Sequence, residues 1–277
     1  MTAPDPLLLA TAVEAVQKAG AIQMTHFGGP MRIDKKGQGQ IDLVTEVDVA
    51  VERMFRAMIA ERFPDHAVLG EELQQDDLLD RRVPGYCWVF DPIDGTTNFA
   101  HGLPIFCASL GLELDGEAVV AAIYDPTRRE LFTAERGQGA RLNGERLAVT
   151  EADAVLNSLL VTGFPYTVHE SQTGAELVAL FGHFLGRSRA VRRLGSAALD
   201  LAYVAAGRFD GFYEATLKPW DSCAGALIVE EAGGRVTDWS GRAFQSRMPQ
   251  VLATNGRIHD EMRAMLAEFY SLRGRTE

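Results

Sequence analysis

Residues 91–99 read D-P-I-D-G-T-T-N-F and directly follow the apolar, strand-like run 87–90. Asp91 and Asp94 place two carboxylates three residues apart, and hard cations such as Mg²⁺ bind oxygen ligands of this kind while keeping positions for water and substrate phosphate. Gly95 lets the backbone approach a ligand closely, and the N–H groups of residues 95–97 would receive a phosphate if they open a helix. Asp-Pro and Asp-Gly are also ordinary turn dipeptides, so the rest of the chain has to decide between a turn and a site.

The size and charge of the chain narrow the choice of function. Its 277 residues, 47 % of them hydrophobic, suit one large domain or two closely packed halves with a substantial core. The formal net charge of −11 argues against a general electrostatic partnership with nucleic acid or an anionic membrane. The same charge would repel an anionic substrate unless bound cations reverse the local sign.

The cysteines and the N-terminal region indicate the compartment. Cys87, Cys107 and Cys223 lie far apart in apolar stretches without zinc-ligand spacing, so we expect buried free thiols in a reducing compartment. No basic segment precedes the apolar residues 7–9, and no apolar run reaches the roughly 18 residues of a membrane span. These features predict a soluble cytoplasmic protein.

The first half of the chain, residues 1–150, is expected to contain two helices beside a mostly antiparallel sheet. Helical spacing of apolar residues marks 6–27 and the segment that follows 42–48, where Thr45 and Asp48 have capping-box spacing. By itself Asp48 would therefore be a helix-start carboxylate. Strands are predicted at 67–70, 87–90, 105–114, 118–124 and 130–134, with a hairpin turn at Asp115-Gly116 and another tight turn within 141–145. The basic, glycine-punctuated loop 35–40 fits a mobile flap or an ordinary hairpin loop equally well.

The second half, residues 151–277, alternates its elements. Strands are predicted at 156–162, 208–214 and 250–254, and helices at 170–185, 197–206, 222–232 and 257–272. Asp221 directly precedes one of these helices, which by default makes it an N-cap. A polar stretch near 150–154 marks the seam, so the pattern predicts an α/β half packed on an α+β half.

Several strings, read together, resemble one protein family. The segments G-E-E (70–72), D-P-I-D-G-T-T-N-F (91–99) and W-D-S-C-A-G-A-L-I-V-E-E-A-G-G (220–234) are similar to the signatures of the inositol monophosphatase family. D-L-V-T-x-x-D (42–48), R-R-L-G-S-A-A (192–198) and F-Y-E (212–214) add support, so the resemblance covers nearly the whole chain. The family belongs to the magnesium-dependent, lithium-sensitive phosphatases that include fructose-1,6-bisphosphatase. The resemblance implies a layered αβαβα sandwich and a homodimer.

The resemblance also implies a metal site. Its ligands would be four carboxylates and one backbone carbonyl: Glu71, Asp91, Ile93 (carbonyl), Asp94 and Asp221. They would hold two Mg²⁺ ions, with Asp91 bridging, and a third, weaker ion on the Glu71 side. Such cations would offset the repulsion between converging carboxylates, and a pair of ions clamps the attacking and leaving oxygens of an in-line displacement.

The implied catalytic residues are Asp48, Thr96 and Glu71. Asp48 and Thr96 would orient and deprotonate the attacking water, so that no phosphoenzyme forms. Phosphate would bind to the N–H groups of Gly95 and Thr96. The implied substrate contacts comprise these two residues, the residues expected around the polyol ring, and one metal ligand: Gly95, Thr96, Gly195, Ser196, Ala197, Glu214 and Asp221.

The predicted function is Mg²⁺-dependent hydrolysis of inositol monophosphate to inositol and phosphate. Glu214 favours a hydroxyl-rich ring because a carboxylate accepts hydrogen bonds from hydroxyls, but Lys218-Pro219 lies in a variable stretch near the pocket. Histidinol phosphate, fructose 1,6-bisphosphate and adenosine 3′,5′-bisphosphate therefore remain alternative substrates. A non-catalytic regulatory protein on the same fold would be expected to lack part of the metal set. A nucleophile-based hydrolase is disfavoured because the chain has no G-x-S-x-G motif.

Four further polar residues are left with alternatives. Lys36 is either a flap lysine near the outer metal shell or an exposed loop lysine. Arg192 and Arg193 either reach a second anionic group of the substrate or pair within the protein or with a neighbouring subunit, the second being the favoured interpretation. His101 shows no partner or metal spacing, so it is interpreted as a loop residue.

Overall fold

The protein is described by a computed structural model that covers residues 5–29, 33–35, 43–73, 79, 82–166, 168–169 and 172–273. Residues 36–40 of the predicted loop 35–40, which include Lys36, and Asp42 lie outside the described residues. The loop is flanked by two short antiparallel strands, β1 (Ile33–Lys35) and β2 (Leu43–Thr45). None of the helices in the described ranges is long and apolar enough to cross a membrane.

Two helices form the first layer. α1 (Pro6–His26) begins where Asp5 accepts the N–H of Leu7, with Pro6 at its first position, a place that suits proline because its missing N–H is not needed there. α2 (Glu46–Arg62) begins with the predicted capping box, in which Thr45 and Asp48 satisfy each other's backbone N–H groups. Both predicted helices are confirmed.

A seven-stranded sheet follows. Its order is β3-β4-β5-β6-β7-β8-β9, with β3 parallel to β4 and every other pair antiparallel. The strands are β3 (Ala67–Gly70), β4 (Tyr86–Asp94), β5 (Cys107–Leu114), β6 (Glu117–Asp125), β7 (Glu130–Glu135), β8 (Gly139–Leu142) and β9 (Glu145–Arg146). The predicted hairpin at Asp115-Gly116 joins β5 to β6, and a short helix α3 (Thr96–Ala100) follows β4.

A second, five-stranded sheet has the order β11-β10-β12-β14-β13, with β10 parallel to both of its neighbours and the remaining pairs antiparallel. The strands are β10 (Leu159–Thr162), β11 (Ala190–Arg192), β12 (Gly211–Glu214), β13 (Arg235–Thr237) and β14 (Val251–Thr254). The remaining elements are a 3-10 turn at Val155–Asn157 and the helices α4 (Gln172–Leu185), α5 (Ala197–Ala205), α6 (Pro219–Glu231) and α7 (His259–Ser271).

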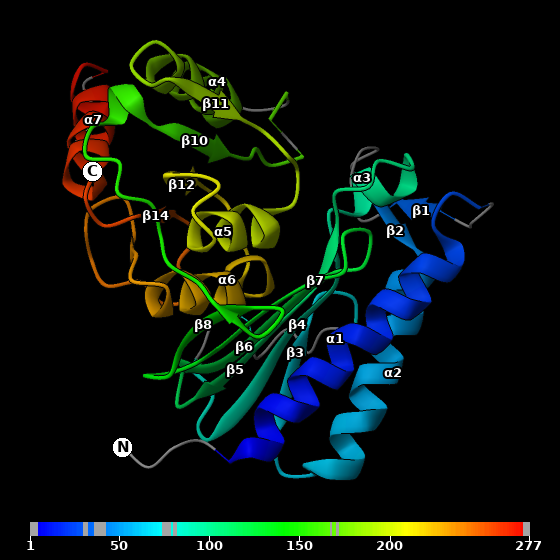
Figure 1. Cartoon of the computed structure of the whole chain (residues 1–277). Helices are drawn as coiled ribbons and strands as arrows, with labels where there is room; N and C mark the ends of the chain where they lie inside the picture. Colours follow the sequence, from blue (N-terminus) through cyan, green and yellow to red (C-terminus); the bar gives the residue numbers. More distant parts are fainter. Residues whose placement is uncertain are drawn as a thin grey trace.

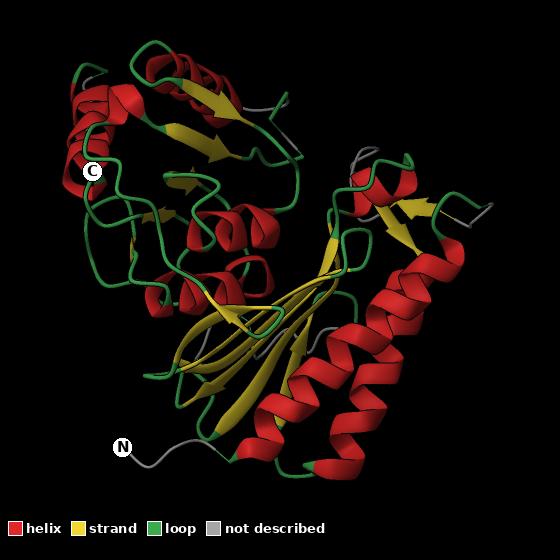
Figure 2. Ribbon diagram, in the orientation of Figure 1, coloured by secondary structure: helices red, strands yellow, loops and turns green. Residues whose placement is uncertain are grey.

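The layers stack as helices, sheet, helices, sheet, helices (Figures 1 and 2). α1 and α2 cover one face of the larger sheet, α5 and α6 lie between the two sheets, and α4 and α7 cover the far face of the smaller sheet. This is the αβαβα sandwich that the resemblance implied, and the α/β fold class is confirmed.

Alternation along β4 shows how one strand serves two layers. Trp88 and Phe90 pack with the α1–α2 layer, whereas Cys87 and Val89 pack with Trp220 of α6. Side chains of a strand point to opposite faces in turn, so β4 is apolar on both sides. Burying a large apolar side chain contributes about 1.5 to 3 kcal/mol to stability. Burial on both faces therefore fixes the part of β4 that directly precedes Asp91 and Asp94.

The structure corrects the bounds of two predicted elements. α6 begins at Pro219, so Asp221 occupies the third helical position and is not the N-cap. Proline is favoured at the first position of a helix, and Pro219 was the signal for this earlier start. The strand predicted at 208–214 comprises only Gly211–Glu214, and the short strands β11 and β13 were not predicted.

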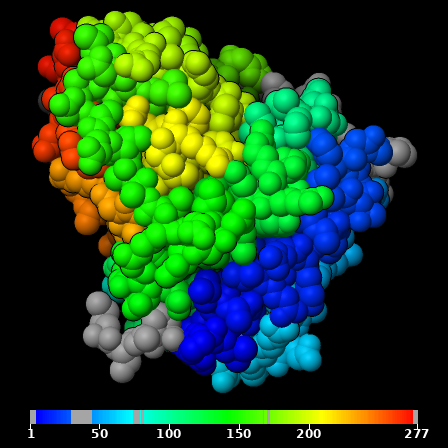
Figure 3. All heavy atoms as spheres, in the orientation of Figure 1, coloured from blue at the N-terminus to red at the C-terminus, as the bar shows by residue number. Residues whose placement is uncertain are grey.

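The seam near 150–154 falls between the last strand of the larger sheet and the first strand of the smaller one. We keep the division into 1–150 and 151–277 as a proposal about chain organisation. The two parts are in close contact, because α6 packs on β5 and β6. In Figure 3 the green spheres, which include residues on both sides of position 150, lie directly against the yellow spheres of the second part.

Candidate active site

The site is built around the end of β4. Asp91 and Asp94 are both buried, and Asp91 Oδ1 accepts the N–H of Ile93 at 2.9 Å. The ladder between β4 and β5 is irregular between the two aspartates. Gly95 follows with φ of +99°, and a Cβ there would lie 2.9 Å from the carbonyl oxygen of Ile105. Only glycine fits this left-handed, crowded turn, which starts α3 directly after the second aspartate.

The third carboxylate comes from the layer between the sheets. Asp221 in the first turn of α6 accepts the N–H of Lys218 at 2.7 Å. One oxygen from each of Asp91, Asp94 and Asp221 lies within 4.8 Å of the others. Residues 127 positions apart in the sequence are therefore brought together, as the resemblance implied.

Burial and mutual repulsion act on this group. Burial raises the pKa of Asp94, and the negative charge of Glu71 raises it further, while hydrogen bonds from Ser196 and Ala198 lower it. Burial also raises the pKa of Asp221, with Asp94 and Glu71 as the next causes. Since like charges disfavour each other's ionised form, the charge of Glu71 acts on Asp94 and Asp221, although Glu71 lies outside the group of three.

The donor set fits a hard divalent cation. All of its potential ligands are oxygens, which Mg²⁺ prefers, and in the described ranges the group contains no histidine or cysteine ligand. Carboxylates this close and this buried are costly unless a cation offsets their charge. The acidic group is thus able to hold a metal ion.

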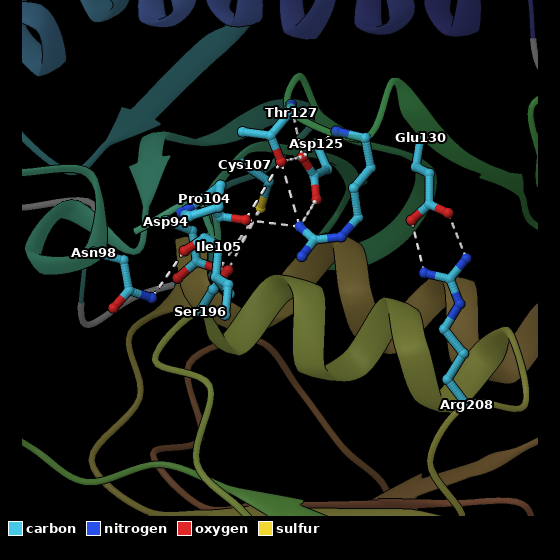
Figure 4. Close-up of polar contacts among 11 residues, drawn as sticks. Asp94, Asn98, Pro104, Ile105, Cys107, Asp125, Thr127, Glu130, Ser196 and Arg208 are labelled. Carbon is cyan, nitrogen blue, oxygen red and sulfur yellow. Dashed lines mark hydrogen bonds and ion pairs between the residues drawn. The ribbon is translucent and has the colours of Figure 1, made fainter. Parts of the chain in front are cut away.

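The carboxylate of Asp94 accepts hydrogen bonds from the start of α5 (Figure 4). Its Oδ2 accepts the Ser196 hydroxyl at 2.5 Å and the Ala198 N–H at 2.8 Å, and its Oδ1 accepts the Ala197 N–H at 3.2 Å. A carboxylate at a helix N-terminus is stabilised by the unpaired N–H groups there. Ser196 and Ala197, expected near the polyol ring, therefore also contact Asp94 directly.

Asp48 of α2 and Thr96 of α3 are in contact beside this group. Asp48 Oδ2 accepts the N–H and hydroxyl of Thr45, as its capping role requires, and its Oδ1 lies 3.3 Å from the hydroxyl of Thr96. The Thr96 hydroxyl is also 2.8 Å from the carbonyl oxygen of Ile93. Asp48 thus serves the helix with one oxygen and faces Thr96 with the other, so the two interpretations of this residue are compatible.

Glu214 lies at the end of β12, where it is buried. Burial raises its pKa, Asp221 and Asp94 raise it further, and the guanidinium of Arg193 lowers it. The Arg193 side chain folds over Gly195, because a Cβ at that glycine would lie 2.6 Å from Nη1. Arg193 therefore faces the site.

The two other uncertain polar residues are exposed on the surface. Arg192 is exposed, at the end of β11. His101 is exposed, immediately after α3, as expected for a loop residue.

Comparison with known proteins settles the family. The family model described as "Inositol monophosphatase family" matches residues 6–272. The chain belongs to the inositol monophosphatase family. The recognition from sequence is confirmed, and with it the assignment of the chain as a phosphoric monoester hydrolase.

Individual relatives of this family member agree. It is 42 % identical over 260 residues to "Nus factor SuhB" of Escherichia coli K12, covering 94 % of each chain. It is equally identical over 259 residues to "Inositol-1-monophosphatase" of Synechocystis, covering 94 % of this chain and 88 % of the relative. The solved inositol monophosphatase of Anabaena superimposes with a TM-score of 0.85 at 38 % identity, covering 97 % of this chain and 98 % of the other.

Two polar residues of this inositol monophosphatase family site were not singled out from sequence. Asn98 Nδ2 lies 2.8 Å from the carbonyl oxygen of Ile105 and 2.9 Å from that of Leu194, so it ties α3 to the loop before α5. Asp200 on α5 is buried, and neither carboxylate oxygen has a hydrogen-bond partner among the described residues. Asn98 lies inside the quoted motif 91–99, and Asp200 is the one acid in an otherwise apolar helix; these were the available signals.

Proposed function

We propose that this protein hydrolyses inositol monophosphate in a Mg²⁺-dependent reaction, giving inositol and inorganic phosphate. The observation that carries the proposal is the convergence of Asp91, Asp94 and Asp221 beside the Asp48–Thr96 pair. Together they supply a place for cations and a route for a proton, which hydrolysis of a phosphate ester by water requires.

The ligands would be the five implied groups, namely the carboxylates of Glu71, Asp91, Asp94 and Asp221 and the carbonyl of Ile93, with two to three ions bound. Bound Mg²⁺ ions would neutralise phosphate charge, orient the ester and lower the pKa of water. Within the protein, the start of α5 keeps the Asp94 carboxylate in one orientation, and the α6 turn keeps that of Asp221. Prepositioned charge of this kind is what phosphoryl transfer needs most.

The proton route runs through Thr96. Its hydroxyl oxygen accepts a proton from the attacking water while its own proton passes to Asp48 Oδ1, 3.3 Å away. The second oxygen of Asp48 stays bonded to Thr45, which keeps the carboxylate pointing at Thr96. The phosphate would be received by the N–H groups of Gly95 and Thr96 at the turn that the positive φ of Gly95 creates.

The alcohol part of the substrate would lie against the α5 side of the site. Gly195, Ser196 and Ala197 form the wall next to Asp94, and Glu214 accepts hydrogen bonds from ring hydroxyls. The positive charge of Arg193 lowers the pKa of Glu214 and so favours its ionised form. This surrounding favours a polyol over the imidazole of histidinol phosphate.

A panel of phosphate esters tests the substrate. We expect phosphate release from inositol 1-phosphate to exceed that from histidinol phosphate, fructose 1,6-bisphosphate and adenosine 3′,5′-bisphosphate, and to require Mg²⁺. A much faster reaction with histidinol phosphate would overturn the choice of substrate.

We also propose that the protein is a cytoplasmic homodimer. Light scattering would measure the mass of the particle in solution.

A regulatory role is a second candidate, because the E. coli relative with 42 % identity is named a Nus factor. Every implied metal ligand is retained in this sequence, which favours turnover. The same panel separates the two: a folded protein inactive on every ester at any Mg²⁺ concentration would favour regulation without catalysis.

A further inference from the structure

Glu52 lies on α2, one helical turn after Asp48, and is completely buried. Its carboxylate faces the bend after β3 that carries Glu71. Oε2 accepts the N–H of Glu72 at 2.7 Å, and Oε1 accepts that of Leu73 at 3.1 Å. Residues 71–73 belong to no helix or strand, so Glu52 supplies the acceptors that a regular ladder would otherwise provide.

Arg56, one turn further along α2, donates to carbonyl groups of the bend and of β3. Its Nε donates to Glu52 Oε1 at 2.8 Å, its Nη2 to the Leu73 carbonyl at 2.6 Å and its Nη1 to the Val68 carbonyl at 3.4 Å. The planar guanidinium fork reaches several acceptors at once, which a lysine cannot do. It also compensates the charge of Glu52, which makes burial of this carboxylate tolerable.

Gly70 at the end of β3 permits this arrangement. A Cβ on Gly70 would lie 2.3 Å from Oε1 of Glu52 and 2.5 Å from its Cδ. The absence of a side chain therefore lets the carboxylate reach the bend, one residue before Glu71. The strand end, the bend and the helix are fitted to one another at this point.

The same helix also carries Asp48, whose Oδ1 lies 3.3 Å from the Thr96 hydroxyl. We propose that Glu52 and Arg56 are positioning residues that fix Glu71, as a cation ligand, relative to Asp48 and the β4 carboxylates. This inference rests on the proposed function, in which Glu71 binds Mg²⁺. Residues that orient metal ligands typically change metal affinity 10- to 100-fold when they are altered.

The experiment compares Glu52→Gln with Glu14→Gln. Both remove one carboxylate from an ion pair on the α1–α2 layer, but Glu14 pairs with Lys18 and Arg62 at the surface, away from the bend. Two quantities are measured for each protein: the Mg²⁺ concentration that half-saturates the rise in melting temperature without substrate, and the one that half-saturates phosphate release. Arg56→Lys is the second test variant.

In Glu52→Gln we expect both half-saturating concentrations to rise about 10- to 100-fold, with kcat largely restored at saturating Mg²⁺. Arg56→Lys should shift in the same direction, and Glu14→Gln should match the wild type. A folded Glu52→Gln with wild-type Mg²⁺ dependence overturns this inference alone; if that variant does not fold, an unchanged Arg56→Lys does so. A wild-type protein without any Mg²⁺ response overturns the proposed function as well.

Discussion

The Ser196 hydroxyl donates a hydrogen bond of 2.5 Å to the carboxylate of Asp94, across 102 positions of sequence. Ser196 is the N-cap of α5, and Asp94 is the last residue of β4. The contact therefore joins the helix layer between the sheets to the strand that carries the quoted motif. Two further N–H groups from α5 reach the same carboxylate, so the orientation of Asp94 is set by both halves of the chain.

Asp94→Asn should reduce kcat by about a hundredfold or more while the fold is kept. The amide removes the negative charge, and its NH₂ group cannot accept the N–H donors of α5. Initial rates of phosphate release and far-UV circular dichroism are the measurements. Asp115→Asn makes the same chemical change in an exposed turn with positive φ, which asparagine tolerates. Full turnover in Asp94→Asn would remove this residue from the ligand set.

Asn98→Ala should raise KM and lower stability. The Asn98 amide holds the carbonyls of Ile105 and Leu194, and loss of a buried hydrogen-bonding partner costs about 1 to 3 kcal/mol. Urea unfolding and steady-state kinetics measure the two effects. Exposed Asn157, mutated in the same way, serves as the control; equal behaviour of the two variants would show that Asn98 does not hold the loop.

His259 should make stability fall as the pH is lowered. Its ring nitrogens lie 2.9 and 3.0 Å from the hydroxyls of Thr237 and Thr254. Burial lowers its pKa to about 4, and nearby Arg235 lowers it as well. In the unfolded chain this histidine binds a proton near pH 6.5, whereas in the folded protein it does so only near pH 4. The stability that the neutral ring contributes above pH 6.5 is therefore lost as the pH falls from 6.5 to about 4.

By linkage, the contribution of His259 to the free energy of unfolding is about 2 to 3 kcal/mol smaller at pH 4.5 than at pH 7.5. The variant His259→Gln is less stable than the wild type at pH 7.5 but lacks this titration. The difference in free energy of unfolding between the two proteins should therefore shrink by about 2 to 3 kcal/mol when the pH is lowered from 7.5 to 4.5. Urea unfolding of both proteins at the two pH values measures the change. A gap that is independent of pH would contradict the assigned shift.

The three cysteines should resist modification in the folded protein. Cys87, Cys107 and Cys223 are buried and unpaired with one another. Burial raises the pKa of Cys87 to about 11, and burial raises those of the other two thiols as well. Since the thiolate is the reactive form, Ellman's reagent at pH 7.5 should detect three thiols only after unfolding in guanidinium. Rapid reaction of any of them in the native state would contradict the burial.

Lithium should inhibit at millimolar concentrations, as the family resemblance implies. Phosphate release is measured in LiCl and in NaCl of equal ionic strength, at fixed Mg²⁺. A rate that falls equally in both salts would point to simple screening, and would remove lithium sensitivity from the properties of this member.

The sequence was sufficient for the elements with strong periodicity. α1, α2 and the hairpin at Asp115-Gly116 appeared as predicted because helical spacing, caps and turn dipeptides are local signals. β11 and β13 were missed because strands of three residues are too short to show a period. The start of α6 was placed late because an aspartate was given more weight than the proline two positions before it.

The site residues also differ in whether a local sequence signal identifies them. Asp91 and Asp94 could be selected from their spacing, whereas Glu71, Asp221 and Asp48 needed the family resemblance, because each has an ordinary local role. Nothing local identifies the supporting residues. Glu52 lies beside Val51 on an amphipathic helix, and only the tertiary structure shows that its side chain enters the bend after β3.

The three acids come from two layers of the fold, and this affects how the two halves of the chain are held together. Asp91 and Asp94 belong to the larger sheet, whereas Asp221 belongs to a helix that packs between the sheets. A ligand that binds all three stabilises only the assembled state. A cation bound by Asp221 together with Asp91 and Asp94 would act as a removable crosslink between the two halves, and chelation should loosen their contact before it unfolds either one.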